Sequence, residues 1–170
     1  MTYHTLVPQP LTKDAFAAYG DVIEANNESQ HFAINYGCTE RYHDLAQIDV
    51  NQQGGKALVS IFRSRPKQQP IKIELMERHP LSSQAFMPLS NNPYLVVVAP
   101  AGEFNQKAII AFIAQHDQGV NYHAGTWHHF SLALNEQSDF LVIDRGGKGD
   151  NCDEVNLEHP IHIVLGEEIS

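Results

Sequence analysis

The sequence predicts a mainly β protein, a sandwich or barrel of two sheets with one short N-terminal helix. Short runs of strand-forming residues recur along the chain and are separated by turn signals rich in Pro, Gly and Asn. Two of these runs, Tyr94–Ala99 and Ala108–Ile113, are apolar throughout, so we expect both faces of each strand to be covered. The length of 170 residues suits one domain, spanning residues 1–170, with a continuous core.

The expected elements follow from local patterns. Thr12 is expected to cap a helix that runs to about Gly20, with Phe16 and Tyr19 on one face. Residues 24–40 are polar and predict an irregular segment. The predicted strands span Lys56–Arg63, Ile71–Met76, Gln84–Pro88, Tyr94–Ala99, Ala108–Ile113, His128–Leu134 and Phe140–Asp144.

Composition excludes several classes of protein. The net charge of −9, from 20 acidic and 11 basic residues, argues against a nucleic-acid-binding surface. Apolar runs such as Leu95–Pro100 are too short to span a membrane, and the N-terminus lacks the features of a signal peptide. Cys38 and Cys152 form no disulfide framework or metal-binding spacing. We therefore expect a cytoplasmic protein with no membrane and no nucleic-acid partner.

Two segments carry candidate chemistry. Glu77 and His79 are two apart, so in a strand they share a face, where a carboxylate and an imidazole can bind a metal or form an acid–base pair. The segment from Tyr122 to His129 holds three histidines and a tryptophan, which core packing alone does not explain. Because inward residues at strand starts line the mouth of a barrel, these segments predict an active site there.

The two segments resemble the two motifs of the cupin superfamily. The first cupin motif is His-x-His followed after three or four residues by Glu, and this chain has Glu77-x-His79, four residues, then Gln84. Glu77 thus replaces the first histidine, and Gln84 replaces the glutamate.

The second cupin motif ends in Pro-x-Gly-x-x-His. Here it follows Gly119 and reads His123-x-Gly125-x-x-His128. Only His128 among these histidines occupies the ligand position of the motif.

Longer blocks along nearly the whole chain resemble the ureidoglycolate lyase family, formerly called ureidoglycolate hydrolases, enzymes of allantoin catabolism. These blocks are Ala17–Glu24, Glu40–Leu45, Glu77–Leu81, Gln84–Phe86, Gly119–His123, Trp127–His129, Asp139–Leu141, Ile143–Gly147 and Asn151–Asp153. The resemblance implies a cupin-like double-stranded β-helix, a jelly-roll-like barrel. It also implies cleavage of (S)-ureidoglycolate to urea and glyoxylate, a homodimer, and a divalent metal, with Ni²⁺ favoured.

The resemblance assigns roles to the matched residues. Glu77, His79 and His128 are the candidate catalytic groups, and which of them acts as acid or base stays open. The same three with Gln84 form the candidate metal set, because two imidazoles and a carboxylate suit a divalent transition metal. Gln84 could instead bind the ureido amide, and whether a metal is bound stays open.

Further residues are candidates for binding the substrate. Arg63 could pair with the substrate carboxylate or face solvent at a strand end, whereas Arg145 is interpreted as part of a structural ion pair. Tyr122, Phe86 and Trp127 could form the wall of the cavity, although ordinary barrel packing is favoured for Phe86, and His123 is a further candidate for binding the substrate. Residues 41–44 could form a lid or a subunit contact.

Three rival functions remain. The chain could be another metal-dependent cupin enzyme that acts on a small carboxylic acid, or an amidohydrolase that releases ammonia from ureidoglycolate. A binding barrel that senses a small acid without catalysis is the third.

Overall fold

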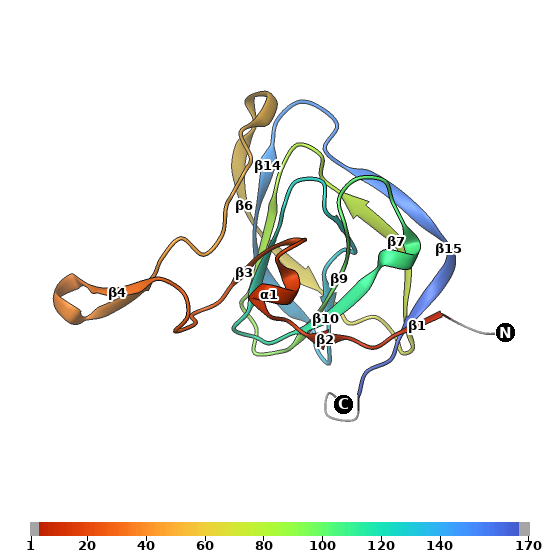
Figure 1. Ribbon diagram of the computed structural model, residues 1–170, viewed down its shortest axis with the longest axis horizontal. Coiled ribbons are helices and arrows are strands. Elements are labelled where there is room, and N and C mark those ends of the chain that lie inside the picture. The colour runs from red at the N-terminus through yellow and green to blue at the C-terminus, as the bar shows by residue number, and fades with distance from the viewer. Residues whose placement is uncertain (1–3, 167–170) are drawn as a thin grey trace.

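The larger of two curled sheets forms one side of the molecule. The computed structural model describes residues 4–166, and in it eight strands form this sheet in the order β1-β15-β7-β12-β9-β10-β2, with β13 also paired to β9 (Figure 1). The bounds of these strands are β1 (His4–Leu6), β2 (Gln9–Pro10), β7 (Ile71–Arg78), β9 (Tyr94–Ala99), β10 (Ile110–Ala114), β12 (Trp127–His128), β13 (Leu132–Ala133) and β15 (Asp153–Ile163).

The second sheet has five strands in the order β3-β11-β8-β14-β6. Its strands are β3 (Gly20–Ile23), β6 (Lys56–Ser64), β8 (Gln84–Pro88), β11 (Gly119–Tyr122) and β14 (Ser138–Gly146). Together the two sheets confirm the predicted mainly β, cupin-like barrel.

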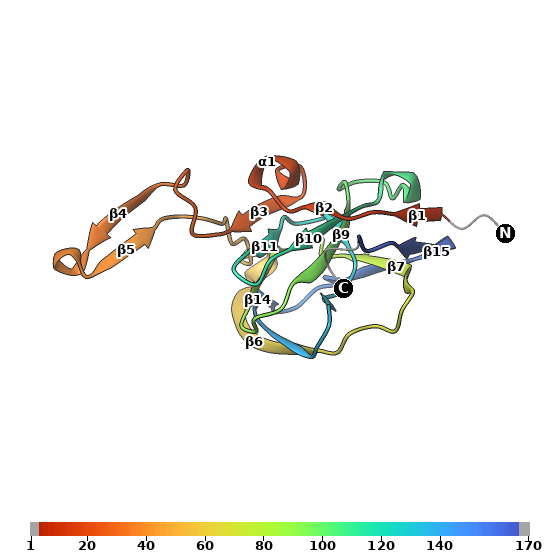
Figure 2. The same cartoon turned by 90° about the horizontal axis from the view of Figure 1, so that it is seen from below.

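A hairpin arm projects from this barrel. It consists of β4 (His31–Ile34) and β5 (Thr39–Tyr42), joined by the 3-10 turn η1 (Asn35–Gly37), and it reaches away from both sheets in two views (Figures 1 and 2). The prediction of an irregular segment over residues 24–40 is therefore confirmed for residues 24–30 and wrong from His31 onward. The arm was missed because its strands are mostly exposed and lack the apolar alternation of a strand that packs on a core.

The one α-helix among residues 4–166, α1 (Lys13–Phe16), is shorter than predicted. The Thr12 hydroxyl accepts a hydrogen bond from the Ala15 backbone N–H at 3.2 Å, which confirms the N-cap. The helix ends at Phe16 because Gly20 already pairs with Tyr122 as the first residue of β3. Phe16 and Tyr19 do contact each other, with ring centroids 5.8 Å apart.

Side chains of β9 alternate between two cores. Leu95, Val97 and Ala99 pack in one core within the larger sheet, together with apolar residues of β7, β13 and β15. Tyr94, Val96 and Val98 pack in the other core, which lies between the sheets and includes residues of β8, β11 and β14. All six residues are buried, which confirms that both faces of this strand are covered.

The strand boundaries agree in part with the prediction. β8 and β9 match, β6, β7 and β14 are longer, and β10 begins after a 3-10 turn, η3 (Gln106–Ala108). The predicted strand over His128–Leu134 is wrong, because the chain forms two short strands, β12 and β13, instead. Strands β1, β2, β3, β11 and β15 were not predicted; β15 pairs with β7 through a bulge between Asn156 and Ile161. Within residues 4–166, no helix has the length and apolarity to cross a membrane.

Candidate active site

Strand pairing brings the candidate residues together from both sheets. In the larger sheet, β12 pairs with β7 so that His128 lies directly opposite Glu77. In the smaller sheet, β11 pairs with β8 so that Tyr122 lies opposite Gln84. The rings of Tyr122 and His128 then stack across the interior, 4.2 Å apart and 1° from parallel. This stack joins the two sheets at the site.

His128 presents a free nitrogen inside the protein. The side chain is 1% exposed, and its Nδ1 donates to the backbone carbonyl of His129 at 3.2 Å. The proton therefore resides on Nδ1, and the lone pair is left on Nε2, which is buried and has no hydrogen-bond partner among the described residues. Burial and the neighbouring His79 lower the pKa of His128 to about 3. His128 is thus a neutral imidazole at physiological pH.

His79 heads a chain of polar contacts. Its Nδ1 donates to the carbonyl of Asn151 at 2.7 Å, and its Nε2 lies 3.1 Å from Oε1 of Gln84. Gln84 in turn donates from Nε2 to the carboxylate of Asp144 at 3.2 Å. Both ring nitrogens of His79 therefore face oxygen acceptors. A neutral imidazole has a single N–H and can donate to only one of these two oxygens, so the space beside Nε2 and Oε1 can accommodate a cation.

Glu77 is half-buried beside the two histidines. Its Oε1 lies 3.9 Å from Nδ1 of His128. Burial raises the pKa of Glu77, the positive charge available on His79 opposes this, and the nearby Glu154 carboxylate raises it further. A raised pKa makes the carboxylate a stronger base than an ordinary glutamate.

These three side chains form a group that could hold a metal ion. One possible ligand atom from each of Glu77, His79 and His128 lies within 4.8 Å of the others. The unpartnered Nε2 of buried His128 and the paired acceptors around His79 both fit a bound cation. Two imidazoles and a carboxylate form a suitable first shell for a divalent transition metal, and the hydrogen bond from His79 to Asn151 would orient that ligand.

A cavity of about 300 Å³ opens beside His79 and Gln84. Its remaining lining residues are Ser82, Asp144, Arg145, Asn151 and Cys152. The sequence did not identify Asp144 or Asn151 as site residues, although both lie in blocks that match the family. Arg145 had been interpreted as part of a structural ion pair, yet within residues 4–166 it pairs with no carboxylate.

Two other candidate residues lie away from this cavity. The Arg63 side chain is 64% exposed and forms a two-pronged ion pair with Asp139 at 2.8 and 3.0 Å. Trp127 follows the alternation of its strand and points to the face opposite His128. There it donates to the carbonyl of Gly102 and stacks with the guanidinium of Arg78, 4.6 Å from its ring centre.

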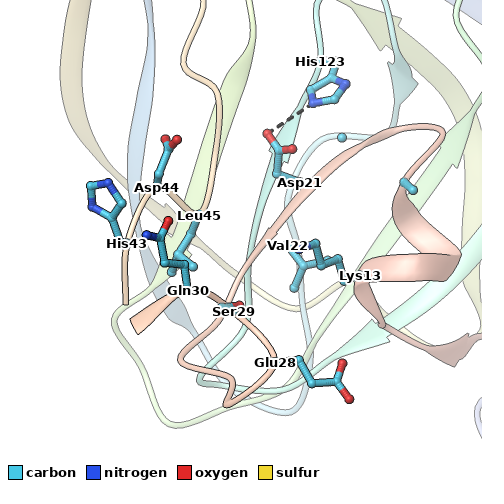
Figure 3. A pocket seen from close by; sticks show the side chains of 12 residues that line it. Lys13, Asp21, Val22, Glu28, Ser29, Gln30, His43, Asp44, Leu45 and His123 are labelled. Carbon is cyan, nitrogen blue, oxygen red and sulfur yellow. Dashed lines mark ion pairs between the residues drawn. The ribbon is translucent and has the colours of Figure 1, made fainter. Parts of the chain in front are cut away.

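His123 belongs to a second cavity of about 310 Å³ (Figure 3). Its side chain is 44% exposed and its Nε2 lies 3.2 Å from the carboxylate of Asp21. His43 and Asp44, expected as part of a lid or subunit contact, line the opposite side of this cavity, at the base of the arm (Figure 3). The structure thus separates His123 from His79 and Gln84.

Comparison with known proteins identifies relatives along nearly the whole chain. Residues 3–164 match the ureidoglycolate lyase family. A ureidoglycolate lyase of Pseudomonas syringae pv. tomato is 52% identical over 162 residues, covering 95% of each chain. The ureidoglycolate lyase of Burkholderia cepacia is 57% identical over 149 residues, covering 87% of this chain and 84% of its own. The chain therefore belongs to the ureidoglycolate lyase family.

Proposed function

We propose that this protein cleaves (S)-ureidoglycolate to urea and glyoxylate in the degradation of allantoin. Family membership supports the reaction. The observation that carries the proposal is the cluster of Glu77, His79 and His128 next to a cavity that would admit a small polar acid.

The reaction requires one proton to move between two atoms on the same carbon. The hydroxyl group must lose its proton as the carbonyl of glyoxylate forms, and the departing urea nitrogen must gain one as the C–N bond breaks. We assign both transfers to Glu77, the one carboxylate of the cluster, which lies beside both histidines. No net proton is consumed.

The two histidines do not take up the hydroxyl proton in this proposal. With a pKa of about 3, His128 is too weak a base to accept that proton, and its unprotonated Nε2 is available as a ligand instead. His79 is oriented by Asn151 and faces the same space. Gln84, positioned between His79 and Asp144, would bind the ureido group.

We further propose that Glu77, His79 and His128 bind a divalent ion, Ni²⁺ by resemblance to the family, and that Gln84 serves the ureido group rather than the ion. When bound, such an ion would stabilise negative charge on the substrate hydroxyl oxygen. The two oxygens of the Glu77 carboxylate would allow this residue both to help hold the ion and to carry the proton. Elemental analysis of purified protein, before and after dialysis against a chelator, tests this assignment.

The assay of the proposed function measures glyoxylate, urea and ammonia released from fresh ureidoglycolate, corrected for spontaneous decay. We expect equal amounts of urea and glyoxylate, and loss of activity in Glu77→Gln and His128→Ala. Ammonia in place of urea would identify an amidohydrolase. Folded, metal-supplemented protein that shows no rate above background would refute both activities, and full activity in the two variants would refute the site.

We also propose that the protein is a cytoplasmic homodimer. On one face of the outer strand β6, the apolar side chains of Val59 and Ile61 are 69% and 54% exposed. Large exposed apolar patches mark interaction surfaces, and the isolated hairpin arm would gain stability from a partner. Both cysteines are exposed and free, which suits a reducing compartment. Light scattering should give twice the 19.0 kDa chain mass, and Val59→Asp should lower it.

A further inference from the structure

Arg145 is a buried cation that shares the cavity of His79 and Gln84. It is the last but one residue of β14, and the whole residue is 8% exposed. Nε donates to the carbonyl of Gln52 at 3.1 Å, and Nη2 donates to the carbonyl of Lys148 at 2.7 Å. These two bonds leave Nη1 for a ligand in the cavity.

The environment of Arg145 differs from that of two other arginines. Arg63 and Arg78 each contact a carboxylate at 2.8 Å, although both are more exposed. Arg145 forms no ion pair with any carboxylate in the described part of the chain, and the adjacent Asp144 accepts from Gln84 instead. A buried charge that only neutral carbonyls contact is costly. An anion in the cavity would remove that cost.

Close packing also holds the guanidinium of Arg145 in a fixed position. A Cβ at Gly55 would overlap Nε of Arg145, and a Cβ at Gly147 would lie 3.2 Å from Nη2 and 3.4 Å from Cζ. Two glycine backbones therefore pack closely against Arg145, from the loop before β6 and from the loop after β14. Such packing fixes the direction of the planar donor group before any ligand arrives.

We propose that Arg145 binds the carboxylate of the substrate, and that the site selects small carboxylic acids that carry a ureido group. This inference rests on the proposed function. When the substrate carboxylate lies on Arg145, the ureido N–H groups face Asp144 and can donate to its carboxylate. In the reverse orientation the substrate carboxylate would face Asp144, and the two negative charges would repel each other. The substrate carbon is then directed toward His79 and Glu77.

This assignment differs from the role that the sequence suggested for Arg63. The guanidinium of Arg63 already donates to both oxygens of Asp139 at the register position where β6 and β14 pair. A substrate carboxylate would have to displace that partner at a largely exposed site. Arg145 has no such partner to displace.

The test pairs one protein change with one ligand change. Calorimetry would measure the affinity of metal-loaded protein for oxalurate, a ureido carboxylate, and for oxaluramide, its neutral amide. We expect wild type to bind oxalurate at least tenfold more tightly. Arg145→Gln should weaken oxalurate binding by about 10- to 100-fold, the effect of one charged hydrogen bond, and should leave oxaluramide binding unchanged. Arg145→Lys should fall between, and Arg65→Gln, at an exposed arginine, should match wild type.

Each other outcome has a definite meaning. Wild type that does not discriminate between the two ligands would overturn the inference, whatever the variants do. Equal loss for both ligands in Arg145→Gln and Arg145→Lys would assign Arg145 a purely structural role and would also overturn it. Arginine-dependent oxalurate binding by a protein without lyase activity would instead refute only the proposed function.

Discussion

Gly55→Ala tests whether the position of Arg145 controls activity without any change to Arg145 itself. The added Cβ would overlap both Nε of Arg145 and the carbonyl oxygen of Val50, and would lie 2.9 Å from Cγ of Arg145. Val50 is 5% exposed and its carbonyl belongs to the backbone, so the arginine and the loop must move. Gly55 itself has a φ of −67°, which alanine adopts without strain.

The expected effects follow from this overlap. Overpacking of this kind costs about 1–3 kcal/mol, which lowers the melting temperature of a domain of this size by roughly 2–12 °C. A shift of about 1 Å in a binding group can lower kcat/KM by about 100-fold. Calorimetric melting and steady-state kinetics on ureidoglycolate, with urea as product, measure both quantities on one preparation.

A matched control separates crowding from a general effect on the loop. A Cβ at the neighbouring Gly54 meets no atom within 4 Å, and its φ of +70° is one that asparagine tolerates. Gly54→Asn should therefore retain the kinetic constants of wild type. If Gly55→Ala also retains them while its melting temperature falls, the guanidinium position does not control catalysis.

Three further predictions concern pH and stability. Burial lowers the pKa of His129 to about 4, so the folded state loses stability as the pH falls from about 6.5 toward that value. In urea melts at pH 4.5, His129→Leu should remove up to about 3 kcal/mol of this loss of stability. If the variant and wild type are equally sensitive to acid, the prediction is refuted. Burial opposes ionisation of Asp21, but hydrogen bonds from Asn121, Gln47 and His123 lower its pKa overall. Asp21→Asn should therefore lower the free energy of unfolding by about 1–2 kcal/mol at pH 7. The difference between variant and wild type should vanish as the pH falls through the pKa of Asp21 in the folded protein. Glu154 lies opposite Glu77 across β15 and β7, and its carboxylate raises the pKa of Glu77. Glu154→Gln should therefore move the acidic limb of the pH profile of kcat/KM down by about half a pH unit at most. An acidic limb that does not move would argue against Glu77 as the proton carrier.

Local sequence predicted the elements whose ends carry strong turn signals. β9 lies between Pro93 and Pro100, and both of its predicted ends agree with the structure. β15 was missed although Val155, Leu157, Ile161 and Ile163 alternate with polar residues, because Pro160 and the polar residues before it interrupt the pattern. The strand is held by its pairing with β7, which lies far earlier in the chain. Such long-range pairing leaves little trace in a single sequence.

Some of the candidate site residues could also be predicted from the sequence, whereas others could not. Motif spacing identified Glu77, His79 and His128, which the fold brings within 4.8 Å. The sequence could have excluded Trp127 from the site, because consecutive residues of one strand point to opposite faces. It could not have excluded Arg63, because the register between β6 and β14 is what places Asp139 beside it.

The same dependence on register explains how this barrel builds its site. Glu77 and His128 come from the larger sheet, whereas Gln84, Tyr122 and Asp144 come from the smaller one. A slip of one residue in either sheet would turn these side chains to the opposite face, so the apolar residues that fix the register also fix the chemistry. Val120 and Val142 flank Phe86 in the paired strands β11, β8 and β14, and all three are buried in the core between the sheets. The protein can therefore keep an arginine without an acidic partner in the cavity, and a buried histidine without a hydrogen bond on Nε2 nearby, because the core between the sheets supplies the stability that these groups do not.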